Sequence, residues 1–179
     1  MNLKKVLSKG LIATLVLAGS LMAGFQAITW ANGNSGLTIF SGVDRKDILD
    51  YYLQFGGRPN QWERYKLYIP AKKMTQGAST FFISYPDYFN GRFDTDKVEV
   101  RVGRESLPLK EVIWDQESRV LEISLAKPIE ASTRVELVLS NVRNPDFGTY
   151  YLVGDVLAAG DIPVRLYLGT WIVSIDPGS

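Results

Sequence analysis

Short runs of alternating apolar and polar residues are the feature that most constrains the fold of this chain. β-Branched and aromatic side chains recur at every second position, and the runs end at proline, glycine or asparagine. Clear examples are Tyr65, Leu67 and Ile69, then Phe81, Ile83 and Tyr85, then Val98, Val100 and Val102. A period of two is typical of strands with one buried and one solvated face, which antiparallel sheets permit and parallel sheets rarely do.

Eight or nine such runs, with turns between them and no long helix, predict an all-β fold. We expect a single-domain antiparallel two-sheet sandwich, of the immunoglobulin-like kind, over residues 37–176. A closed barrel is the second choice. Residues 44–55 allow a competing helix capped by Asp44, but the run Tyr-Tyr-Leu-Gln-Phe favours a strand there.

The first 31 residues have the pattern of a secretory signal peptide. Lys4, Lys5 and Lys9 precede an uncharged, mostly apolar run over residues 11–24, and Ala31 offers a small-residue cleavage site. The run is shorter than the roughly 20 residues that cross a bilayer, although an uncleaved anchor is the alternative. Residues 32–36 are polar and glycine-rich, as in a flexible lead-in segment. We therefore expect export to the periplasm, the cell envelope or the medium, with membrane contact only through an uncleaved leader.

The composition narrows the chemistry that the chain can perform. It has no cysteine and no histidine, which excludes disulfides, thiolate metal sites, cysteine nucleophiles and the usual general base near neutral pH. The chain has 20 basic and 19 acidic residues, and the leader holds three of the lysines, so the mature chain carries a formal charge of −2. No basic run remains, so nucleic acid is not an expected partner. No nucleotide-binding glycine motif occurs, and no cofactor is expected.

Carboxylates are the main candidates for catalysis or metal binding. A glycoside hydrolase needs two carboxyl groups that face each other across a sugar. Asp94 with Asp96, and Asp115 with Glu117, are available two residues apart, a spacing that puts both side chains on one face of a strand but fixes nothing in a turn. Residues 90–96 also resemble a calcium loop in composition, but the closing glutamate of an EF-hand is absent and Arg92 lies inside the segment. Turn-forming roles explain these residues more simply, so we predict no catalytic residue and no metal site.

Tyrosine and tryptophan side chains are the candidates for binding. In a strand, neighbouring side chains point to opposite faces, so one member of the pair Tyr150 and Tyr151 faces outward. Exposed rings suit a glycan or a protein surface, although the same rings could instead fill the core. The residues predicted to bind a protein or glycan of the cell envelope are Tyr52, Trp62, Tyr68, Tyr88 and Tyr150.

Asp155 interrupts an apolar run and follows Gly154. Strict alternation would place it on one face with Tyr151, Val153 and Leu157, where a buried carboxylate without a partner would cost several kcal/mol. We expect either a bulge at Gly154 that turns Asp155 outward, or an ion pair with Arg143 or Arg165.

Several segments together carry a family resemblance. They are EVIWD (111–115), LEI (121–123), VELVL (135–139), NVRNP (141–145), GTYY (148–151) and YLGTW (167–171). Over residues 37–175 the chain resembles a cyanobacterial family of secreted proteins classed as a domain of unknown function. The resemblance implies a signal peptide and a β-sandwich-like fold, and it supplies no catalytic residue, substrate or cofactor.

The sequence therefore predicts a secreted, non-enzymatic binding or structural module of the cell envelope. An envelope hydrolase with paired carboxylates is the alternative. A third possibility is an architectural subunit that docks by adding a strand to a sheet edge.

Overall fold

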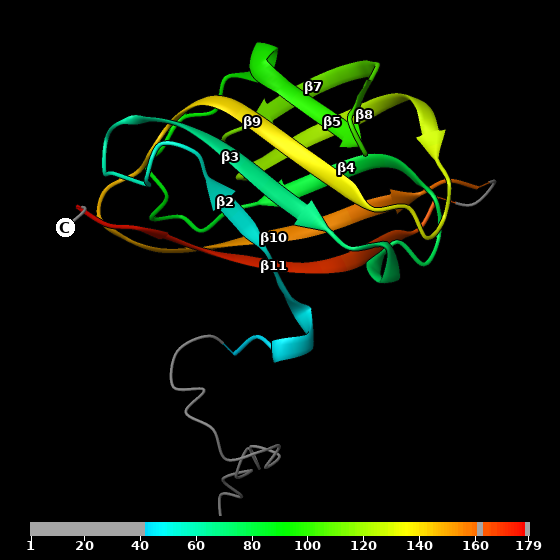
Figure 1. Cartoon of the computed structure of the whole chain (residues 1–179), viewed down its shortest axis with the longest axis horizontal. Coiled ribbons are helices and arrows are strands. Elements are labelled where there is room, and N and C mark those ends of the chain that lie inside the picture. Colours follow the sequence, from blue (N-terminus) through cyan, green and yellow to red (C-terminus); the bar gives the residue numbers. More distant parts are fainter. Residues whose placement is uncertain (1–41, 161–162, 178–179) are drawn as a thin grey trace, which may run out of the picture. The chain divides into compact units, whose positions relative to one another are not determined.

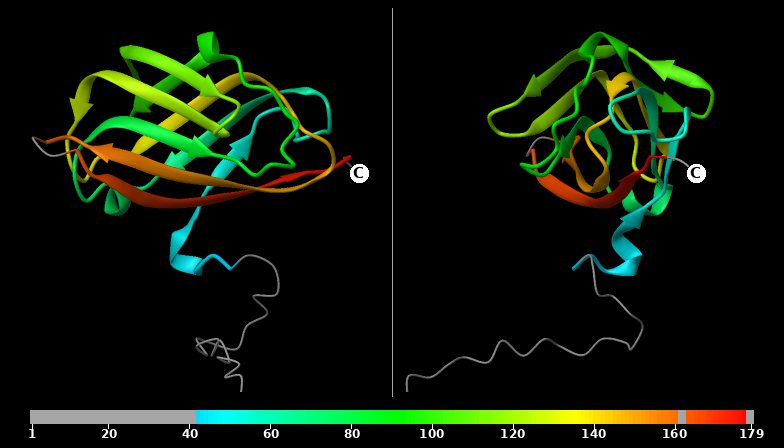
Figure 2. Two further views of the ribbon diagram at one scale, coloured as in Figure 1. Left: turned by 180° about the vertical axis from the view of Figure 1, so that it is seen from behind. Right: turned by 90° about the vertical axis from the view of Figure 1, so that its left-hand side faces the viewer.

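A computed structural model describes residues 42–160 and 163–177, which form two β-sheets packed face to face (Figures 1 and 2). The predicted signal peptide, residues 1–31, and the lead-in segment, residues 32–36, lie outside the described residues. Within the described part of the chain, no helix has the length and apolarity needed to cross a membrane. Three single-turn 3₁₀ helices are present there: η1 (Arg45–Asp47), η2 (Ala71–Lys73) and η3 (Thr95–Lys97).

The strands divide into a six-stranded and a five-stranded sheet. The six-stranded sheet has the order β1 (Ile48–Leu49), β11 (Arg165–Ile175), β10 (Gly148–Ala158), β4 (Ala78–Ser84), β8 (Val120–Ile129) and β7 (Leu109–Asp115). The five-stranded sheet has the order β2 (Tyr51–Leu53), β3 (Trp62–Ile69), β9 (Val135–Arg143), β5 (Val98–Val102) and β6 (Glu105–Leu107). The predicted two-sheet sandwich is confirmed.

Two expectations about the topology need correction. The sheets keep separate edge strands, β1 and β7 in one and β2 and β6 in the other, so the closed-barrel alternative is wrong. All neighbouring strands are antiparallel except β1, which pairs with β11 in parallel. The competing helix over residues 44–55 is also wrong: after η1 the segment forms β1 and β2, and the chain passes from one sheet to the other at Asp50.

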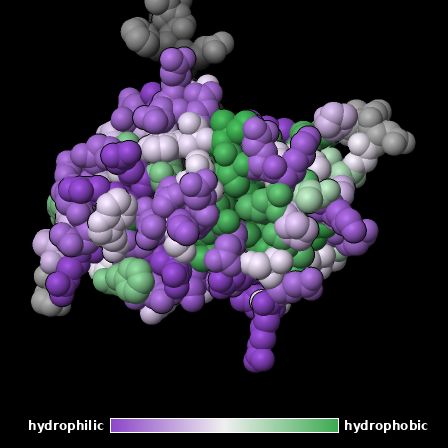
Figure 3. Space-filling view, turned by 90° about the horizontal axis from the view of Figure 1, so that it is seen from above, coloured by the Kyte–Doolittle hydropathy of each residue, from purple (hydrophilic) through white to green (hydrophobic). Residues whose placement is uncertain are grey.

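Alternation along each strand builds the core between the sheets. In β3, Tyr65, Leu67 and Ile69 are fully buried, whereas Lys66 and Tyr68 on the other face are partly exposed. On the side of the sandwich where β5, β6 and β7 lie, half-buried apolar side chains reach the surface between charged ones (Figure 3). These side chains are Val102, Leu107, Leu109 and Val112.

Asp155 shows one of the two expected solutions, the ion pair. The register shift between β10 and β11 places its extra residue, Leu168, in β11, so the bulge expected at Gly154 is wrong. Alternation in β10 continues without a break and turns Asp155 to the outer face, as it does Val153. In addition, the Arg165 guanidinium donates from Nε and Nη2 to the Asp155 Oδ2 atom, at 3.1 and 2.9 Å. Gly154 itself is required for packing, because a Cβ atom there would lie 2.7 Å from the indole ring of Trp171.

The Tyr65 side chain links the core to the turn that contains Asn144. Its hydroxyl also makes the free energy of unfolding depend on pH in the alkaline range. Its buried hydroxyl donates to the Asn144 side-chain oxygen at 2.8 Å. Burial, and next the Glu63 carboxylate, raise the pKa of Tyr65 far above its usual value. As the pH rises, the Tyr65 hydroxyl therefore loses its proton in the unfolded chain before it does so in the folded domain. The contribution of Tyr65 to the free energy of unfolding is complete below about pH 10 and declines as the pH rises further.

Replacing Tyr65 by phenylalanine should lower the free energy of unfolding by about 1–2 kcal/mol near pH 8, because Asn144 loses its donor. The same variant should lose less stability than the wild type between pH 8 and about pH 11. Urea unfolding at the two pH values measures both effects, with Tyr52→Phe at an exposed ring as the control. An identical alkaline decline in the wild type and Tyr65→Phe would contradict this assignment.

Candidate functional site

One end of the sandwich gathers several connections and four exposed aromatic side chains. We call it the loop end, and it consists of residues 54–61, 85–94, 115–119 and 144–147 and of Trp62, the first residue of β3. The strand registers bring these segments together, since Trp62 is opposite Arg143 and Ser84 is opposite both Val120 and Val153. In Figure 1 it is the end at which β11 finishes.

Four aromatic side chains at the loop end are more than half exposed. They are Phe55 (58%), Trp62 (60%), Tyr88 (55%) and Phe147 (71%). They come from three different connections and from the first residue of β3. Rings so exposed contribute little to the core of the domain. A concentration of them on loops held by a rigid scaffold is typical of binding surfaces.

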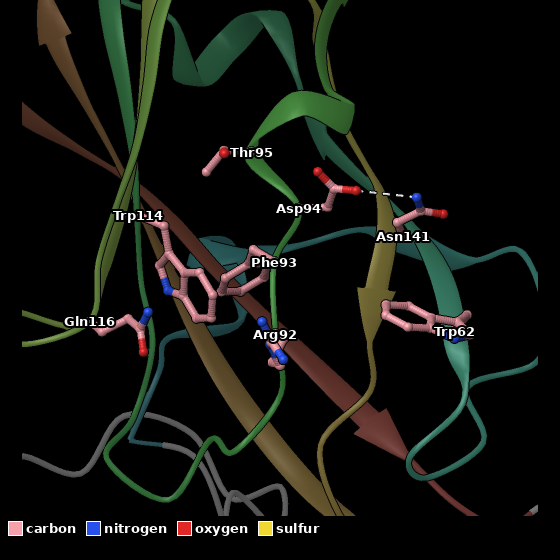
Figure 4. A pocket seen from close by; sticks show the side chains of 8 residues that line it. All are labelled: Trp62, Arg92, Phe93, Asp94, Thr95, Trp114, Gln116 and Asn141. Carbon is pink, nitrogen blue, oxygen red and sulfur yellow. Dashed lines mark hydrogen bonds between the residues drawn. The ribbon is translucent and has the colours of Figure 1, made fainter.

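A hollow of ≈620 Å³ opens between the two sheets at this end (Figure 4). Its lining residues are Trp62, Arg92, Phe93, Asp94, Thr95, Trp114, Gln116 and Asn141. Figure 4 shows the two indoles on opposite sides, with Arg92, Phe93 and Asp94 between them. The volume falls within the roughly 300–1,000 Å³ of small-molecule sites.

The wall that contains Trp114 is fixed by packing. The Trp114 indole nitrogen donates to the Tyr85 hydroxyl at 2.8 Å, and its ring meets Phe93 edge-on with centroids 5.5 Å apart. Phe93 in turn stacks on Phe89, with centroids 5.3 Å apart. These contacts hold the orientation of the Trp114 ring.

A bulge in β9 places Asn141 on the opposite wall. The step from Glu63 to Tyr65 in β3 faces the three-residue step from Val142 to Leu139 in β9, so one extra residue is accommodated. Asn141 has a φ of 53°, a left-handed conformation that asparagine tolerates better than most residues. Its amide donates to the Asp94 Oδ2 atom at 3.2 Å.

Several polar groups of the hollow remain uncommitted. Among the described residues, the side chains of Arg92, Thr95 and Gln116 make no hydrogen bond or ion pair. Asp94, in contrast, is engaged twice, because its other oxygen accepts from the backbone nitrogen of Asp96 at 3.1 Å. The hollow thus combines fixed aromatic walls with donors and acceptors that are available to a ligand.

Two carboxylates brace the loops around the hollow. Buried Glu63 accepts hydrogen bonds from the backbone nitrogens of Phe55, Gly57 and Arg64, at 2.6, 2.8 and 2.8 Å. These bonds hold the turn between β2 and β3.

Asp146 links that turn to two other segments, residues 85–94 and its own turn, 144–147. Its carboxylate accepts from the side-chain amides of Asn60 and Asn90, at 2.9 and 2.7 Å. These hydrogen bonds, that from Asn60 first, hold the pKa of Asp146 below its usual value. The three turns that surround the hollow are therefore preorganised.

The five residues predicted to bind do not share one surface. Trp62 and Tyr88 lie at the loop end. Tyr52 and Tyr68 lie on the outer face of the five-stranded sheet, where Lys66 is opposite Tyr52 and its ammonium is 5.8 Å from that ring.

The expectation that Tyr150 is exposed is wrong. Only 3% of Tyr150 is accessible, because alternation in β10 turns it inward and leaves Tyr151 partly exposed. The Tyr88 ring lies 5.5 Å from it between centroids, and the Tyr150 hydroxyl donates to the Asp146 carbonyl at 2.9 Å.

The carboxylate pairs have local structural tasks. Asp115 Oδ1 accepts from the backbone nitrogens of Glu117 and Ser118, both at 3.0 Å, and these bonds, chiefly with Ser118, lower the pKa of Asp115. Asp94 caps η3 by the bond to Asp96 described above. In the described part of the chain, no three acidic side chains come together in a way that could hold a metal ion.

Sequence reasoning missed the residues that complete this site. The sequence patterns do not mark four of them as binding residues: Phe55, Phe147, Trp114 and Asn141. The sequence does indicate a structural role for Glu63. Glu63 lies two positions before Tyr65 and therefore on the buried face of the strand, where a carboxylate needs hydrogen-bond donors.

The fold and the site define an all-β sandwich domain with an aromatic loop end. The chain belongs to the family described as "Protein of unknown function (DUF2808)", whose model matches residues 37–175. No curated protein matches the chain.

Solved structures resemble the domain at low sequence identity. The bacterial hydrophobin BslA is 14% identical, with a TM-score of 0.49 over 72% of this chain and 92% of that one. An uncharacterised Nocardia farcinica protein with an immunoglobulin-like fold is 8% identical, with a TM-score of 0.44 over 71% and 96%. Domains D2 and D3 of the major pilin SpaD from Corynebacterium diphtheriae are 13% identical, with a TM-score of 0.47 over 68% and 50%.

Proposed function

We propose that this protein is an exported, non-catalytic binding module that uses its loop end to hold a component of the cell envelope. The observation that carries the proposal is the concentration of four exposed aromatic rings at the loop end, one of which, Trp62, lines a hollow with uncommitted polar side chains. Binding sites combine apolar contact area with a few directed polar groups, and braced loops reduce the entropy lost on binding.

The pattern of residues 1–31 supports the export step. A basic start, an apolar run and a small-residue cleavage site are what a secretory signal needs. The formal charge of −2 after its removal favours neither nucleic acid nor an anionic membrane surface.

The arrangement of the carboxylates favours binding over hydrolysis. A glycoside hydrolase places two carboxyl groups about 5–10 Å apart across the substrate. Among the described residues, Asp94 is the only acidic one that lines the hollow, and both of its carboxylate oxygens accept hydrogen bonds.

Binding to isolated native cell envelope tests the proposal. Trp62→Ala and Phe147→Ala should each weaken co-sedimentation of the purified protein about 10-fold or more, as expected for exposed aromatic anchors. Tyr52→Ala is the matched control, because it removes a half-exposed ring from the outer sheet face. Loss of binding in Tyr52→Ala, with full binding in both loop-end variants, would contradict the proposal.

A further inference from the structure

We infer that the hollow between Trp62 and Trp114 is a glycan site, in which an indole stacks on the pyranose ring of an oligosaccharide. This inference rests on the proposed function and specifies the class of ligand. Three features of the hollow carry it: an available aromatic platform, the chemistry of its polar groups, and the strands from which it is built.

The aromatic platform is Trp62. A pyranose ring has faces of C–H groups and an edge of hydroxyls, so it needs a flat apolar surface with polar groups beside it. Trp62 is 60% exposed, and no hydrogen bond of its indole nitrogen occurs among the described residues. Figure 4 shows its ring at the rim of the hollow, across from Trp114. Indoles supply large, rigid contact areas with a polar edge.

The polar groups of the hollow fit hydroxyls. Arg92, Gln116 and Thr95 offer a guanidinium fork, an amide and a hydroxyl, none of which has a partner within the described chain. The Asp94–Asn141 hydrogen bond uses the amide nitrogen of Asn141, so the side-chain oxygen of Asn141 remains available to accept. Planar groups with several donors and acceptors can bind adjacent hydroxyls of one sugar.

The same groups disfavour other classes of ligand. A lipid chain would have to desolvate Arg92, Asp94 and Gln116 without replacing their hydrogen bonds, which is costly. An extended peptide is recognised by adding a strand to a free sheet edge. Trp62 and Asn141 instead come from β3 and β9, each of which pairs with a strand on both sides, so only the wall with Trp114, on the edge strand β7, offers a free edge.

Direct binding to defined glycans tests the ligand class. The purified protein is applied to an array of neutral, amino and acidic oligosaccharides, and the affinity for the best ligand is measured by calorimetry. Trp62→Ala and Arg92→Ala should each weaken this affinity about 10-fold or more. Tyr52→Ala, which removes a half-exposed ring from the outer face of the five-stranded sheet, should retain the wild-type affinity.

A second arm separates this inference from the proposed function. Periodate, which cleaves vicinal diols, should abolish binding of the protein to native envelope, whereas protease treatment of the envelope should not. Binding that survives periodate and is lost after protease treatment would overturn the glycan site and leave the binding function intact. Absence of binding to untreated envelope would overturn both. Glycan binding that is unchanged in Trp62→Ala and Arg92→Ala would overturn the assignment to this hollow.

Discussion

Replacing Trp171 by alanine is expected to lower the free energy of unfolding by about 3–5 kcal/mol, the largest effect of any single substitution considered for this domain. Trp171 is fully buried and belongs to β11 of the six-stranded sheet. Its indole nitrogen donates to the backbone carbonyl of Tyr68, in β3 of the opposite sheet, at 3.3 Å. The ring thus joins the two sheets by packing and by a hydrogen bond.

We expect a large loss of stability in Trp171→Ala because the neighbouring residues cannot move into the space that the indole leaves. Gly154 provides no side chain beneath the ring, and its backbone is fixed between β4 and β11. Removal of the indole therefore leaves a cavity in addition to the lost transfer free energy. Since domains of this kind are stable by roughly 5–15 kcal/mol, the variant retains only part of its stability.

Thermal unfolding followed by circular dichroism measures this effect. Trp171→Ala should lower the Tm by roughly 10–20 °C, given a few degrees for each kcal/mol in a domain of this size. Trp62→Ala is the matched control: the same atoms are removed from a ring that is 60% exposed, and the Tm should stay near that of the wild type. Equal losses in the two variants would contradict the placement of Trp171 between the sheets.

Replacing Glu63 by alanine is expected to be the second most costly substitution, at about 2–4 kcal/mol. The Glu63 carboxylate is buried and accepts from three backbone nitrogens, as described for the loop end. Hydrogen bonds to a charged acceptor are stronger than neutral ones, and the nitrogens of Phe55 and Gly57 would be left without this acceptor. The turn that carries Phe55 and leads to Trp62 should loosen.

Amide hydrogen exchange distinguishes local loosening from general destabilisation. In Glu63→Ala, the amides of Phe55, Gly57 and Arg64 should exchange faster than in the wild type, by more than the global loss of stability explains. Glu105→Ala, at an exposed strand position, should leave both the stability and these amides unchanged. Unchanged protection of the three amides in Glu63→Ala would refute the bracing role.

The fold was predictable because its signal is local. Alternation along residues 65–69 and 81–85 indicates which side chains are buried, and the structure places them in the core. At Asp155 the expected ion pair with Arg165 is present, but the expected bulge at Gly154 is not, because alternation in β10 already turns Asp155 outward. The parallel pairing of β1 was not predictable, because it depends on where the chain crosses between the sheets.

The candidate site was only partly predictable, because its parts are distant in the sequence. Trp62 and Tyr88 follow from their positions next to turns, but the face that Tyr150 occupies depends on the register of β10 with its neighbours. The hollow combines residues of β3, β7, β9 and the segment before η3. Only the packing of the two sheets brings these segments together.

The central claim is that the loop end is the functional face, and a hydrogen-exchange footprint of the protein on native envelope tests it most directly. The account predicts slower exchange, on binding, within the loop-end segments 54–61, 85–94, 115–119 and 144–147. It also predicts unchanged exchange in β2, β3 and β9 around Tyr52 and Tyr68, on the outer face of the five-stranded sheet. Protection confined to β2, β3 and β9 around Tyr52 and Tyr68, with the loop end unaffected, would contradict it.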